Sequence, residues 1–415
     1  MEMDHTPKPL RPYSRSMEVT DRRRTLPAGL ALGGTAVAFT SLYLAAGSIT
    51  PILVEYRLLW KFPPSMLSLA FAAYAIGFLL AALTLGSLSD HIGRRPLLIA
   101  ALIVQLASNL LFLLAPDIGW VIAGRIIQGI ASGAATSAFT AAMVELAPEH
   151  KKRLGTILGS VSLTGGLASG SLLAGLAIEF TPVANTIIFI ALIGLTILGG
   201  TVVVFSPETM SRNAGALGSM VPRVSIPPAA RKEFAAAAPV VAAVWMLAGL
   251  SGGIAPSLVR SVFHLDSGLL DGVAGFVAPA VSAVIGLSSA RVDPRRAMTI
   301  GIYAAIVGAL GIIGGVFAGS LAIMIIGQAI AGVGFGACFT AALRLLFPLA
   351  LAQQRARVVA AIYVVSYVAF GLSIIIEGQL VGPLGQIPAV VCYTALTVLL
   401  ALISLIAQAR LKHQA

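Results

Sequence analysis

Long apolar runs without a charged residue recur along this chain and restrict its fold more than any other feature. No Asp, Glu, Lys or Arg occurs from Phe62 to Ser89 or from Pro96 to Pro116. About 20 apolar residues in a helix cross the ~30 Å hydrocarbon core of a bilayer, so runs of this length predict membrane-spanning segments. Spanning strands would alternate in polarity, and these runs do not. We therefore expect helices, which bond their own backbone groups within the lipid.

The composition agrees with a membrane-embedded chain. Only 10% of the 415 residues are charged and 58% are hydrophobic, whereas soluble domains carry about 25% charged residues. The first apolar run, Thr25 to Val54, is too long for the core of a signal peptide, so we expect a retained helix and no cleaved leader. The two cysteines, Cys338 and Cys392, lie in different apolar runs, which predicts neither a disulfide framework nor a metal site.

We predict an all-α membrane protein with twelve spanning helices, which places both termini on the same side. The expected helices are residues 28–54, 65–89, 96–115, 119–147, 154–178, 184–205, 236–258, 268–289, 297–317, 320–347, 358–380 and 386–409. The expected units are a cytoplasmic tail (1–27), a six-helix bundle (28–205), a cytoplasmic linker (206–235), a second six-helix bundle (236–409) and a short tail (410–415).

The basic residues indicate which side of the membrane the termini occupy. With both termini in the cytoplasm, three of the 27 Lys and Arg residues fall outside (Arg57, Lys61, Arg260) and two fall within helices (Arg125, Arg344). The rest are cytoplasmic, as the positive-inside rule requires. The net charge of +11 is therefore a sign of topology, and nucleic acid is not an expected partner. We expect a bacterial inner membrane.

The two halves of the chain resemble one another. The segment GSITPILVEYRL (47–58) matches GGIAPSLVRSVF (252–263), so that Pro51 falls on Pro256 at an offset of 205 residues. GRIIQGIASGA (124–134) matches GQAIAGVGFGA (327–337) at an offset of 203. These ordered matches predict a duplicated six-helix unit, and internal repeats of this kind are typical of secondary transporters.

A polar hinge separates the second and third predicted helices. It carries Gly86, Asp90, Gly93, Arg94 and Arg95 in the order G-x-x-x-D-x-x-G-R-R. We expect Gly86 to let its helix approach a neighbour and Gly93 to permit a tight turn at positive φ. The spacing resembles the loop 2–3 signature of the major facilitator superfamily, G-x-x-x-D-x-x-G-R-(R/K).

Two further segments resemble signatures of the same superfamily. Arg125-Ile-Ile-Gln128-Gly129 resembles its helix 4 signature, R-x-x-Q-G, and SPET (206–209) resembles the Pro-Glu-Thr ending that is common after helix 6. With the internal repeat, the resemblance covers almost the whole chain. It implies twelve-helix transporters that work by alternating access, and it leaves the substrate open.

The resemblance also suggests a role for the hinge as a conformational gate. Asp90 is placed to accept hydrogen bonds from the start of the helix at 358–380, where the helix dipole favours an anion. Arg94 and Arg95 are expected to pair with Glu145 at the end of helix 119–147. Such contacts would hold the cytoplasmic side shut in the outward-facing state. The arginines alone would also fit a solvated, positively charged loop.

The corresponding hinge of the second half differs. It reads Asp293-Pro294-Arg295-Arg296 and has no counterpart of Gly93. A hinge whose acidic residue directly precedes proline is shorter and stiffer, because proline fixes its own φ. We therefore expect the gate to depend mainly on the first hinge.

The fifth predicted helix carries a partial antiporter signature. Gly166, Gly170, Ser171 and Gly175 resemble the G-x-x-x-G-P-x-x-G-G segment of drug/proton antiporters in this superfamily, with Ser171 in place of Pro and Ala174 in place of the first Gly of the final pair. The match favours proton-coupled export. Ordinary close packing of helices through small residues is the alternative interpretation.

A few polar residues lie inside apolar runs. Arg125 is ~10 Å into the bilayer at ~1.5 Å per residue, and a charge at that depth predicts a function. With Gln128 and Glu377, Arg125 forms a candidate proton-coupling set, since a buried Glu can carry a proton. The alternatives are that Arg125 snorkels to the outer interface and that Glu377 reaches external water. We expect Asp266 and Asp271 at the membrane interface.

Several aromatic residues on the spanning helices are candidates for a substrate pocket. They are Tyr43, Tyr74, Trp245, Phe276, Tyr363 and Tyr367. Aromatic side chains with few charges suit a lipophilic or weakly cationic substrate, although packing or lipid contact would explain each one equally well.

The sequence thus predicts a class of transport protein but not its substrate. No Walker sequence G-x-x-x-x-G-K-(S/T) occurs, so ATP-driven transport by this chain is not expected, and no nucleophile–base set predicts an enzyme. We expect a monomeric, proton-coupled exporter of lipophilic small molecules (multidrug-type efflux) that uses the proton gradient and no cofactor. The alternative is a proton-coupled or facilitative importer of a small metabolite.

Overall fold

The computed structural model describes residues 25–289 and 291–414, and within them every regular element is a helix. Twelve helices are long and apolar enough to cross a membrane, so the predicted all-α fold is confirmed. The first six are α1 (Ala28–Trp60), α2 (Pro64–Leu85), α4 (Arg94–Leu113), α5 (Ile118–Leu146), α6 (Lys152–Phe180) and α7 (Ala184–Phe205). The second six are α9 with α10 (Arg231–Gly249, Ala255–Ser261), α11 (Gly268–Ser289), α12 (Pro294–Phe317), α13 (Leu321–Leu346), α14 (Ala352–Leu384) and α15 (Gln386–Gln414).

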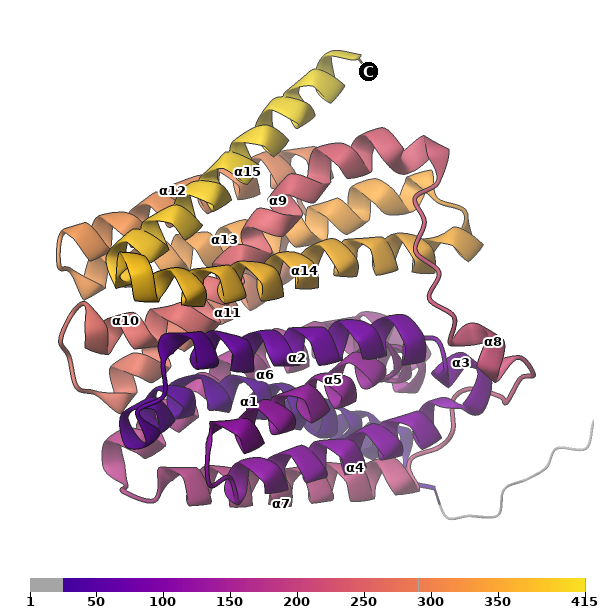
Figure 1. Ribbon diagram of the computed structural model, residues 1–415. Coiled ribbons are helices and arrows are strands. Elements are labelled where there is room, and N and C mark those ends of the chain that lie inside the picture. Colours follow the sequence, from indigo (N-terminus) through magenta and orange to yellow (C-terminus); the bar gives the residue numbers. More distant parts are fainter. Residues whose placement is uncertain (1–24, 290, 415) are drawn as a thin grey trace, which may run out of the picture.

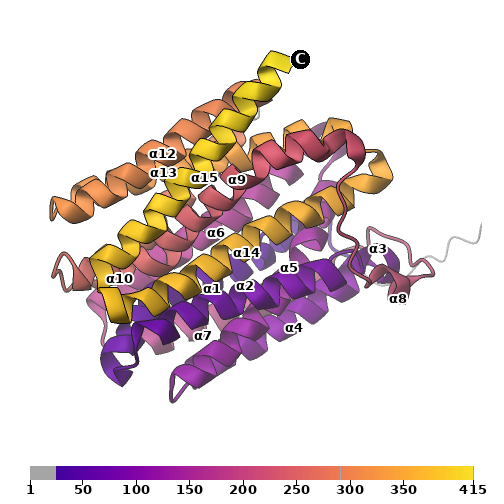
Figure 2. The same ribbon diagram turned by 45° about the horizontal axis from the view of Figure 1, so that its top comes forward.

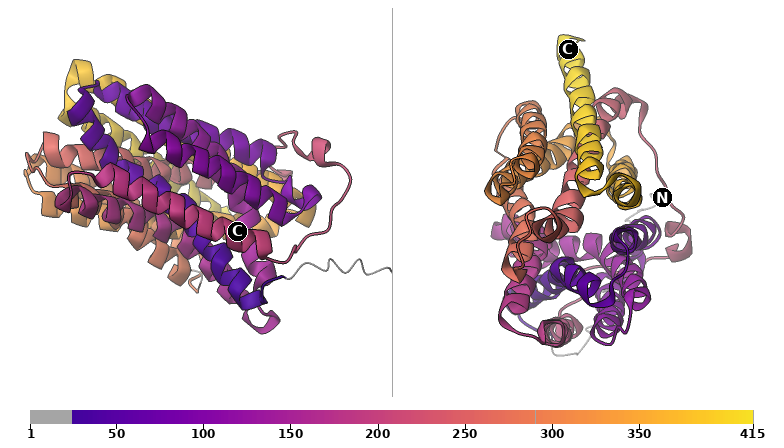
Figure 3. Two further views of the ribbon diagram at one scale, coloured as in Figure 1. Left: turned by 90° about the horizontal axis from the view of Figure 1, so that it is seen from below. Right: turned by 60° about the vertical axis from the view of Figure 1, so that its left-hand side comes forward.

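The helices form two bundles that lie side by side (Figure 1). One bundle contains α1–α7 and the other contains α9–α15. The right-hand view of Figure 3 shows the same division, whereas the two bundles overlap in the view of Figure 2. A single connection from Ser206 to Pro227 joins them at the right-hand end of Figure 1, beside the short helices α3 (Ser89–Ile92) and α8 (Ala216–Ser219). We call this end of the bundles the linker face and the opposite end the far face.

Four predicted boundaries are wrong by five or six residues, each because charged residues continue a helix. α14 begins at Ala352 rather than at residue 358 and includes Arg355 and Arg357. α1 runs to Trp60 rather than to residue 54, and the ring of Tyr56 stacks on Trp60 with the centroids 4.2 Å apart. α9 begins at Arg231 inside the predicted linker 206–235, since Glu233 is buried in the second bundle. The predicted tail 410–415 is helical as far as Gln414. Of the predicted tail 1–27, residues 1–24 lie outside the described residues.

The seventh span contains a π-helical turn, Leu250–Ile254, between α9 and α10. Pro256 follows at the start of α10 and cannot donate a backbone hydrogen bond. Its ring would also clash with the carbonyl group four residues earlier in a regular helix. The wider π turn at the Gly252-Gly253 pair relieves this clash, and Gly252 lies on the wall of a cavity between the two bundles.

Candidate functional site

A cavity of about 860 Å³ lies between the two bundles. At the linker face it reaches Arg153 in the first turn of α6 and Arg344 near the end of α13. Towards the far face its polar lining includes Thr50 of α1, Arg125 of α5 and Ser171 of α6, the last beside Gly275 of α11. A cavity of this size accommodates a drug-sized molecule. It is continuous with one end of the bundle interface and stops short of the other.

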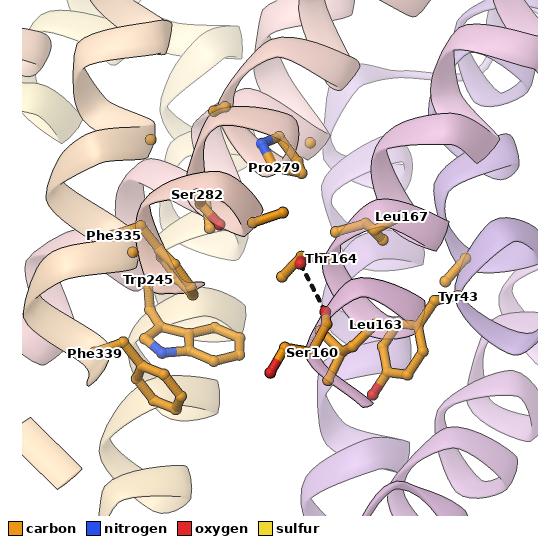
Figure 4. Close-up of a pocket in the computed structure, with 18 of the residues that line it drawn as sticks. Tyr43, Ser160, Leu163, Thr164, Leu167, Trp245, Pro279, Ser282, Phe335 and Phe339 are labelled. Atoms are coloured by element: carbon orange, nitrogen blue, oxygen red, sulfur yellow. Dashed lines mark hydrogen bonds between the residues drawn. The ribbon is translucent and has the colours of Figure 1, made fainter. Parts of the chain in front are cut away.

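The two walls of this cavity differ in chemistry (Figure 4). On the side of the second bundle, the ring of Trp245 lies 5.4 Å from that of Phe335 and 5.9 Å from that of Phe339, centroid to centroid. Facing them across the cavity, Ser160 and Thr164 of α6 present hydroxyl groups, and the Thr164 hydroxyl donates a 2.9 Å hydrogen bond to the Ser160 carbonyl. The second-bundle wall is therefore mainly aromatic here, whereas the first-bundle wall combines hydroxyl groups with aromatic rings such as Tyr43 and with two arginines, Arg125 and Arg153.

Five of the six aromatic residues proposed for a pocket line this cavity. They are Tyr43, Tyr74, Trp245, Tyr363 and Tyr367. Phe276 is the exception, and its prediction is wrong because α11 turns a different face to the cavity. That face carries Gly275, Ala278, Pro279 and Ser282. Sequence reasoning missed Phe335 and Phe339, which lie on one face of α13, four residues apart.

Arg125 is buried in the wall of the cavity and is only 2% exposed, so the snorkelling alternative is wrong. Its Nε donates to the Ala70 carbonyl at 3.2 Å and its Nη1 donates to Gln128 Oε1 at 2.5 Å. The guanidinium carbon lies 4.4 Å from the centre of the Tyr74 ring and 5.5 Å from that of Phe71. No carboxylate among the described residues forms an ion pair with it.

At the far face, α6 and α11 meet through their backbones. A Cβ atom added to Gly175 would lie 2.6 Å from Gly272 Cα, and one added to Gly272 would lie 2.8 Å from the Ser171 carbonyl oxygen. The Ser171 hydroxyl donates a 3.1 Å hydrogen bond to the Gly272 carbonyl. We call this contact the glycine seal, and it closes the cavity on this side by joining the two bundles.

The other small residues of the antiporter-like segment face α1. An added Cβ would lie 2.1 Å from the Leu44 carbonyl oxygen at Gly170, and 3.0 Å from the Thr40 carbonyl oxygen at Gly166. The segment therefore packs closely on two sides, against α1 within its own bundle and against α11 of the other. This is the close helix packing that small residues permit in membranes.

A charged cluster lies beside the glycine seal. Arg260 of α10 contacts Glu55 of α1, and it bonds Asp266 at 2.5 Å and Asp271 at 2.8 Å. Asp266 is 91% exposed, as expected for the interface, but Asp271 is fully buried under Arg260. The interfacial depth of Asp271, in the first turn of α11, stays a prediction, but its side chain is enclosed by protein and not by water. Since Glu55 belongs to the other bundle, Arg260 also joins the two bundles.

Glu377 of α14 is buried and 4% exposed, so the alternative that it reaches external water is wrong. Its Oε1 has no hydrogen-bond partner in the described part of the chain. Arg57 of α1 interacts with it electrostatically across the bundle interface. The structure does not bring Glu377 together with Arg125 and Gln128, since neither of them is bonded to it.

At the linker face, the first hinge bonds within its own bundle. Arg94 pairs with Asp90 in the preceding turn and donates to Glu145 Oε1 of α5 at 3.2 Å. The Thr209 hydroxyl donates to the other Glu145 oxygen at 2.6 Å. The Asp90 side chain is 47% exposed and makes no contact with α14 in this structure. Its postulated partner across the interface is therefore not engaged in this conformation.

Arg95 does not form the ion pair that was expected. It does not reach Glu145, and its side chain donates to the Ser206 carbonyl at 3.4 Å. The Arg94 and Arg95 backbone N–H groups donate to the two oxygens of Glu208 at 2.8 and 3.1 Å. A carboxylate at this position caps the N-terminus of α4 and is stabilised by the helix dipole.

Of the two glycines in the first hinge, only Gly93 occupies a position that requires glycine. Gly93 has φ +100°, and an added Cβ would lie 2.6 Å from Glu208 Oε2, so both its conformation and its neighbour require glycine. An added Cβ at Gly86 would instead meet the Ala82 carbonyl oxygen in the preceding turn, at 2.4 Å. The expected close approach of Gly86 to a neighbouring helix is therefore wrong, although its carbonyl accepts a 2.8 Å hydrogen bond from Ser137 of α5.

The second hinge is also satisfied within its own bundle. Asp293 caps α12 by accepting a 3.0 Å hydrogen bond from the Arg296 backbone. Arg295 pairs with Glu233 of α9 at 2.7 Å. Arg344, which also lines the cavity, donates to the Val292 carbonyl at 2.7 Å. No cap of the kind that Glu208 provides in the first half is needed, because Asp293 supplies it locally.

Residues 31–374 match the family model of the Major Facilitator Superfamily. This chain belongs to that superfamily. It is a family of transporters and not of enzymes, and the twelve helices make this member an integral membrane protein. The signatures at the hinge, at Arg125 and at SPET therefore belong to a family member.

Relatives of this superfamily member are distant. It is 31% identical over 99 residues to the putative metabolite transport protein YwtG of Bacillus subtilis, covering 24% of this chain and 22% of that protein. It is 28% identical over 135 residues to the inner membrane transport protein YajR of Escherichia coli, covering 32% of this chain and 29% of that protein. The chain thus matches less than a third of the length of either relative.

A solved structure extends the comparison to the whole fold. A transporter of the POT family in complex with 5-aminolevulinic acid superposes with a TM-score of 0.73 and 12% identity, covering 92% of this chain and 96% of that one. The likeness shows that this superfamily member shares the overall helix arrangement.

Proposed function

We propose that this chain is a secondary active transporter that exports lipophilic small molecules by alternating access, with protons moving inward in exchange. The observation that carries the proposal is the aromatic cavity of about 860 Å³ between two bundles, which reaches one face while the glycine seal closes the other. A cavity open to one side at a time is the requirement of alternating access.

The distribution of Lys and Arg supports a cytoplasmic linker face. With that orientation the structure is the inward-facing state, in which a molecule enters the cavity from the cytoplasm or from the inner leaflet. A single chain supplies both bundles and the whole cavity, so we propose a monomer. The inner membrane of a bacterium is the location that fits the charge pattern.

Two buried carboxyl groups near the far face are candidates for carrying protons. Asp271 Oδ1 and Glu377 Oε1 each lack a hydrogen-bond partner within the described residues. Burial favours the neutral form of a carboxyl group, and an opposite charge nearby favours the ionised form. Asp271 lies under Arg260, whereas Glu377 interacts with Arg57 without an ion pair. Glu377 is therefore the better candidate to change protonation state during transport.

The alternative function is import of a small metabolite, which is favoured by the relative named as a putative metabolite transport protein. Transport by the purified protein in proteoliposomes with an imposed pH gradient distinguishes the two. Export predicts that a lipophilic dye moves against its own gradient while protons move in the opposite direction. Uptake of a metabolite down the proton gradient, with no movement of dye, would show that the direction is import.

Replacing Glu377 tests proton coupling within this proposal. Glu377→Gln keeps the shape but cannot ionise, so we expect dye transport driven by the pH gradient to fall at least about tenfold while exchange of dye at equal pH continues. The measurement is the initial rate at several gradients. Glu149→Gln is the control, because that carboxylate is 92% exposed in a loop. An unchanged dependence on pH in Glu377→Gln would remove this residue from coupling.

A further inference from the structure

We infer that the substrate is an amphipathic organic anion, with one carboxylate or sulfonate group that pairs with Arg125 and an aromatic body that packs towards Trp245. The inference rests on the proposed function, since it names the class of molecule that the same cavity would carry. It differs from the lipophilic or weakly cationic substrate that the aromatic content of the sequence alone suggests.

The charges along the cavity have a single sign. The described residues that line it include three arginines, Arg125, Arg153 and Arg344, and no Asp or Glu. Arg153 and Arg344 stand at the linker-face mouth, and Arg125 stands deeper in the wall. A cleft lined by one sign of charge between apolar walls concentrates ions of the opposite sign. This arrangement attracts anions and repels cations.

Arg125 is the residue that demands an anionic partner. Its guanidinium is buried, and its described partners are all neutral: a carbonyl group, an amide oxygen and two aromatic rings. Arginine keeps its proton under physiological conditions, and a buried charge is costly unless it is paired. Its Nη2 makes no hydrogen bond in the described part of the chain, so one edge of the guanidinium is available to a ligand.

A second donor lies next to this guanidinium. Gln128 is fully buried, and its Oε1 accepts the bond from Arg125, which leaves its Nε2 amide hydrogens without a partner among the described residues. A buried donor without an acceptor is destabilising. Gln128 does not line the cavity, so it holds the guanidinium in place, and the free Nη2 edge of Arg125 is the group that a carboxylate or sulfonate can bond.

A continuous series of aromatic rings connects Arg125 to the opposite wall. The guanidinium lies over Tyr74, whose ring centroid is 6.1 Å from that of Phe78. Phe78 stacks on Tyr367 at 4.1 Å, and Tyr367 lies 4.7 Å from Trp245. A molecule with an anionic head at Arg125 would therefore have aromatic partners along its body. This arrangement sets the orientation of the ligand, with its anionic group at Arg125 and its aromatic rings towards Trp245.

The resemblance to antiporters assigns Arg125 to proton coupling, and the two roles differ in what they require. Coupling through Arg125 needs a carboxylate of the protein close to it, and none of the described acids pairs with this side chain. An anionic ligand supplies that charge itself. The two roles therefore predict different selectivity in binding at constant pH.

The experiment uses two probes that differ by one sulfonate group. The dye 8-anilino-1-naphthalenesulfonate carries a sulfonate, and N-phenyl-1-naphthylamine has the same aromatic body without it. Binding of each to the purified full-length protein in nanodiscs is measured against empty nanodiscs, with ethidium as a cationic probe. We expect the sulfonate to bind at least about tenfold more tightly than the neutral analogue, and ethidium to bind least.

The variants assign the preference to Arg125. Arg125→Gln should remove the tenfold preference although the neutral probe still binds, which shows that the cavity is still formed. Glu149→Gln, at an exposed carboxylate, should keep the preference. Arg125→Lys should restore part of the preference, because it restores the charge without the planar guanidinium. Equal binding of the two naphthyl probes by the unmodified protein, or a preference for ethidium, would overturn the inference.

Transport separates this inference from the proposed function. If the neutral probe is pumped by a pH gradient and the sulfonate is not preferred, the export proposal stands and the inference about the anion fails. If the sulfonate is preferred through Arg125 but no probe moves against its gradient, the site selects anions and the export proposal fails.

Discussion

The two ends of the bundle interface hold their polar groups in different ways. At the far face, bonds cross from one bundle to the other: Ser171 donates to Gly272, Arg260 contacts Glu55, and the Ser267 hydroxyl donates to Glu179 at 2.8 Å. At the linker face, the bonds of the hinges stay within a bundle, as in the Arg94–Glu145 and Arg295–Glu233 pairs.

This difference indicates at which end more bonds between the bundles must break if the transporter works by alternating access. Opening the far face breaks bonds that join the two bundles, although Arg260 keeps Asp266 and Asp271 as partners within the second bundle. Closing the linker face breaks few, since the hinges are already satisfied and Asp90 keeps an exposed carboxylate. Under the proposed alternating access, the expected contact of Asp90 with the start of α14 would form in the outward-facing state and would offset part of the loss at the far face.

The largest effect is expected from filling the glycine seal. Gly272→Val places atoms where a Cβ alone would lie 2.8 Å from Gly175 Cα, so the far face cannot close and transport should fall at least a hundredfold. The measurement is transport in proteoliposomes, with labelling from the far face of a cysteine at Ser267 in a Cys392→Ser background. Gly194→Val is the control, because an added Cβ there meets nothing within 4 Å. Normal transport by Gly272→Val would show that the seal is not part of the cycle.

A smaller effect is expected from the charged cluster beside the seal. Asp271→Asn removes the buried partner of Arg260 and should lower the free energy of unfolding by about 1–3 kcal/mol. Asp266→Asn alters an exposed partner of the same arginine and should cost less than about 0.5 kcal/mol. The measurement is thermal unfolding of both variants in the same nanodiscs. Equal losses would mean that burial of Asp271 makes no difference to the cluster.

The smallest effect is expected at the linker face, in Asp90→Asn. In the present state Asp90 bonds only within its own hinge, so the stability of the variant should stay within about 0.5 kcal/mol of the parent. Transport should nevertheless fall about fivefold, which is roughly 1 kcal/mol, because the outward-facing state loses a contact. Full transport activity at normal expression would exclude the gate role of Asp90.

The sequence predicts the helices and the two bundles because their signals are local. Long apolar runs identify the spans wherever their partners lie, and the order of Gly93 and Arg94 marks a turn at positive φ. The pairing of distant elements is not encoded in this way. Glu208 caps α4 from more than a hundred residues away, and Asp271 is buried by an arginine on another helix.

The position of side chains around a helix was harder to predict than their depth. Phe276 lies at the depth of the cavity but on the wrong face of α11, and Phe335 and Phe339 were overlooked because α13 is apolar on all sides. A helix surrounded by lipid and by protein carries little periodic signal in its hydrophobicity. The position of Arg125 in an apolar run predicts a functional charge at depth, but it leaves snorkelling to the interface open, and only the packing of α5 against α2 decides that the side chain is buried.

The glycine seal has a consequence for how such a transporter can diversify. The contact at the far face rests on backbone atoms of α6 and α11, whereas the side chains proposed for recognition, such as Trp245 and Phe335, line the cavity elsewhere on the interface. If both proposals hold, substitutions that alter the substrate leave the far-face contact unchanged. One fold could then acquire new substrate specificities while the contact between α6 and α11 stays the same.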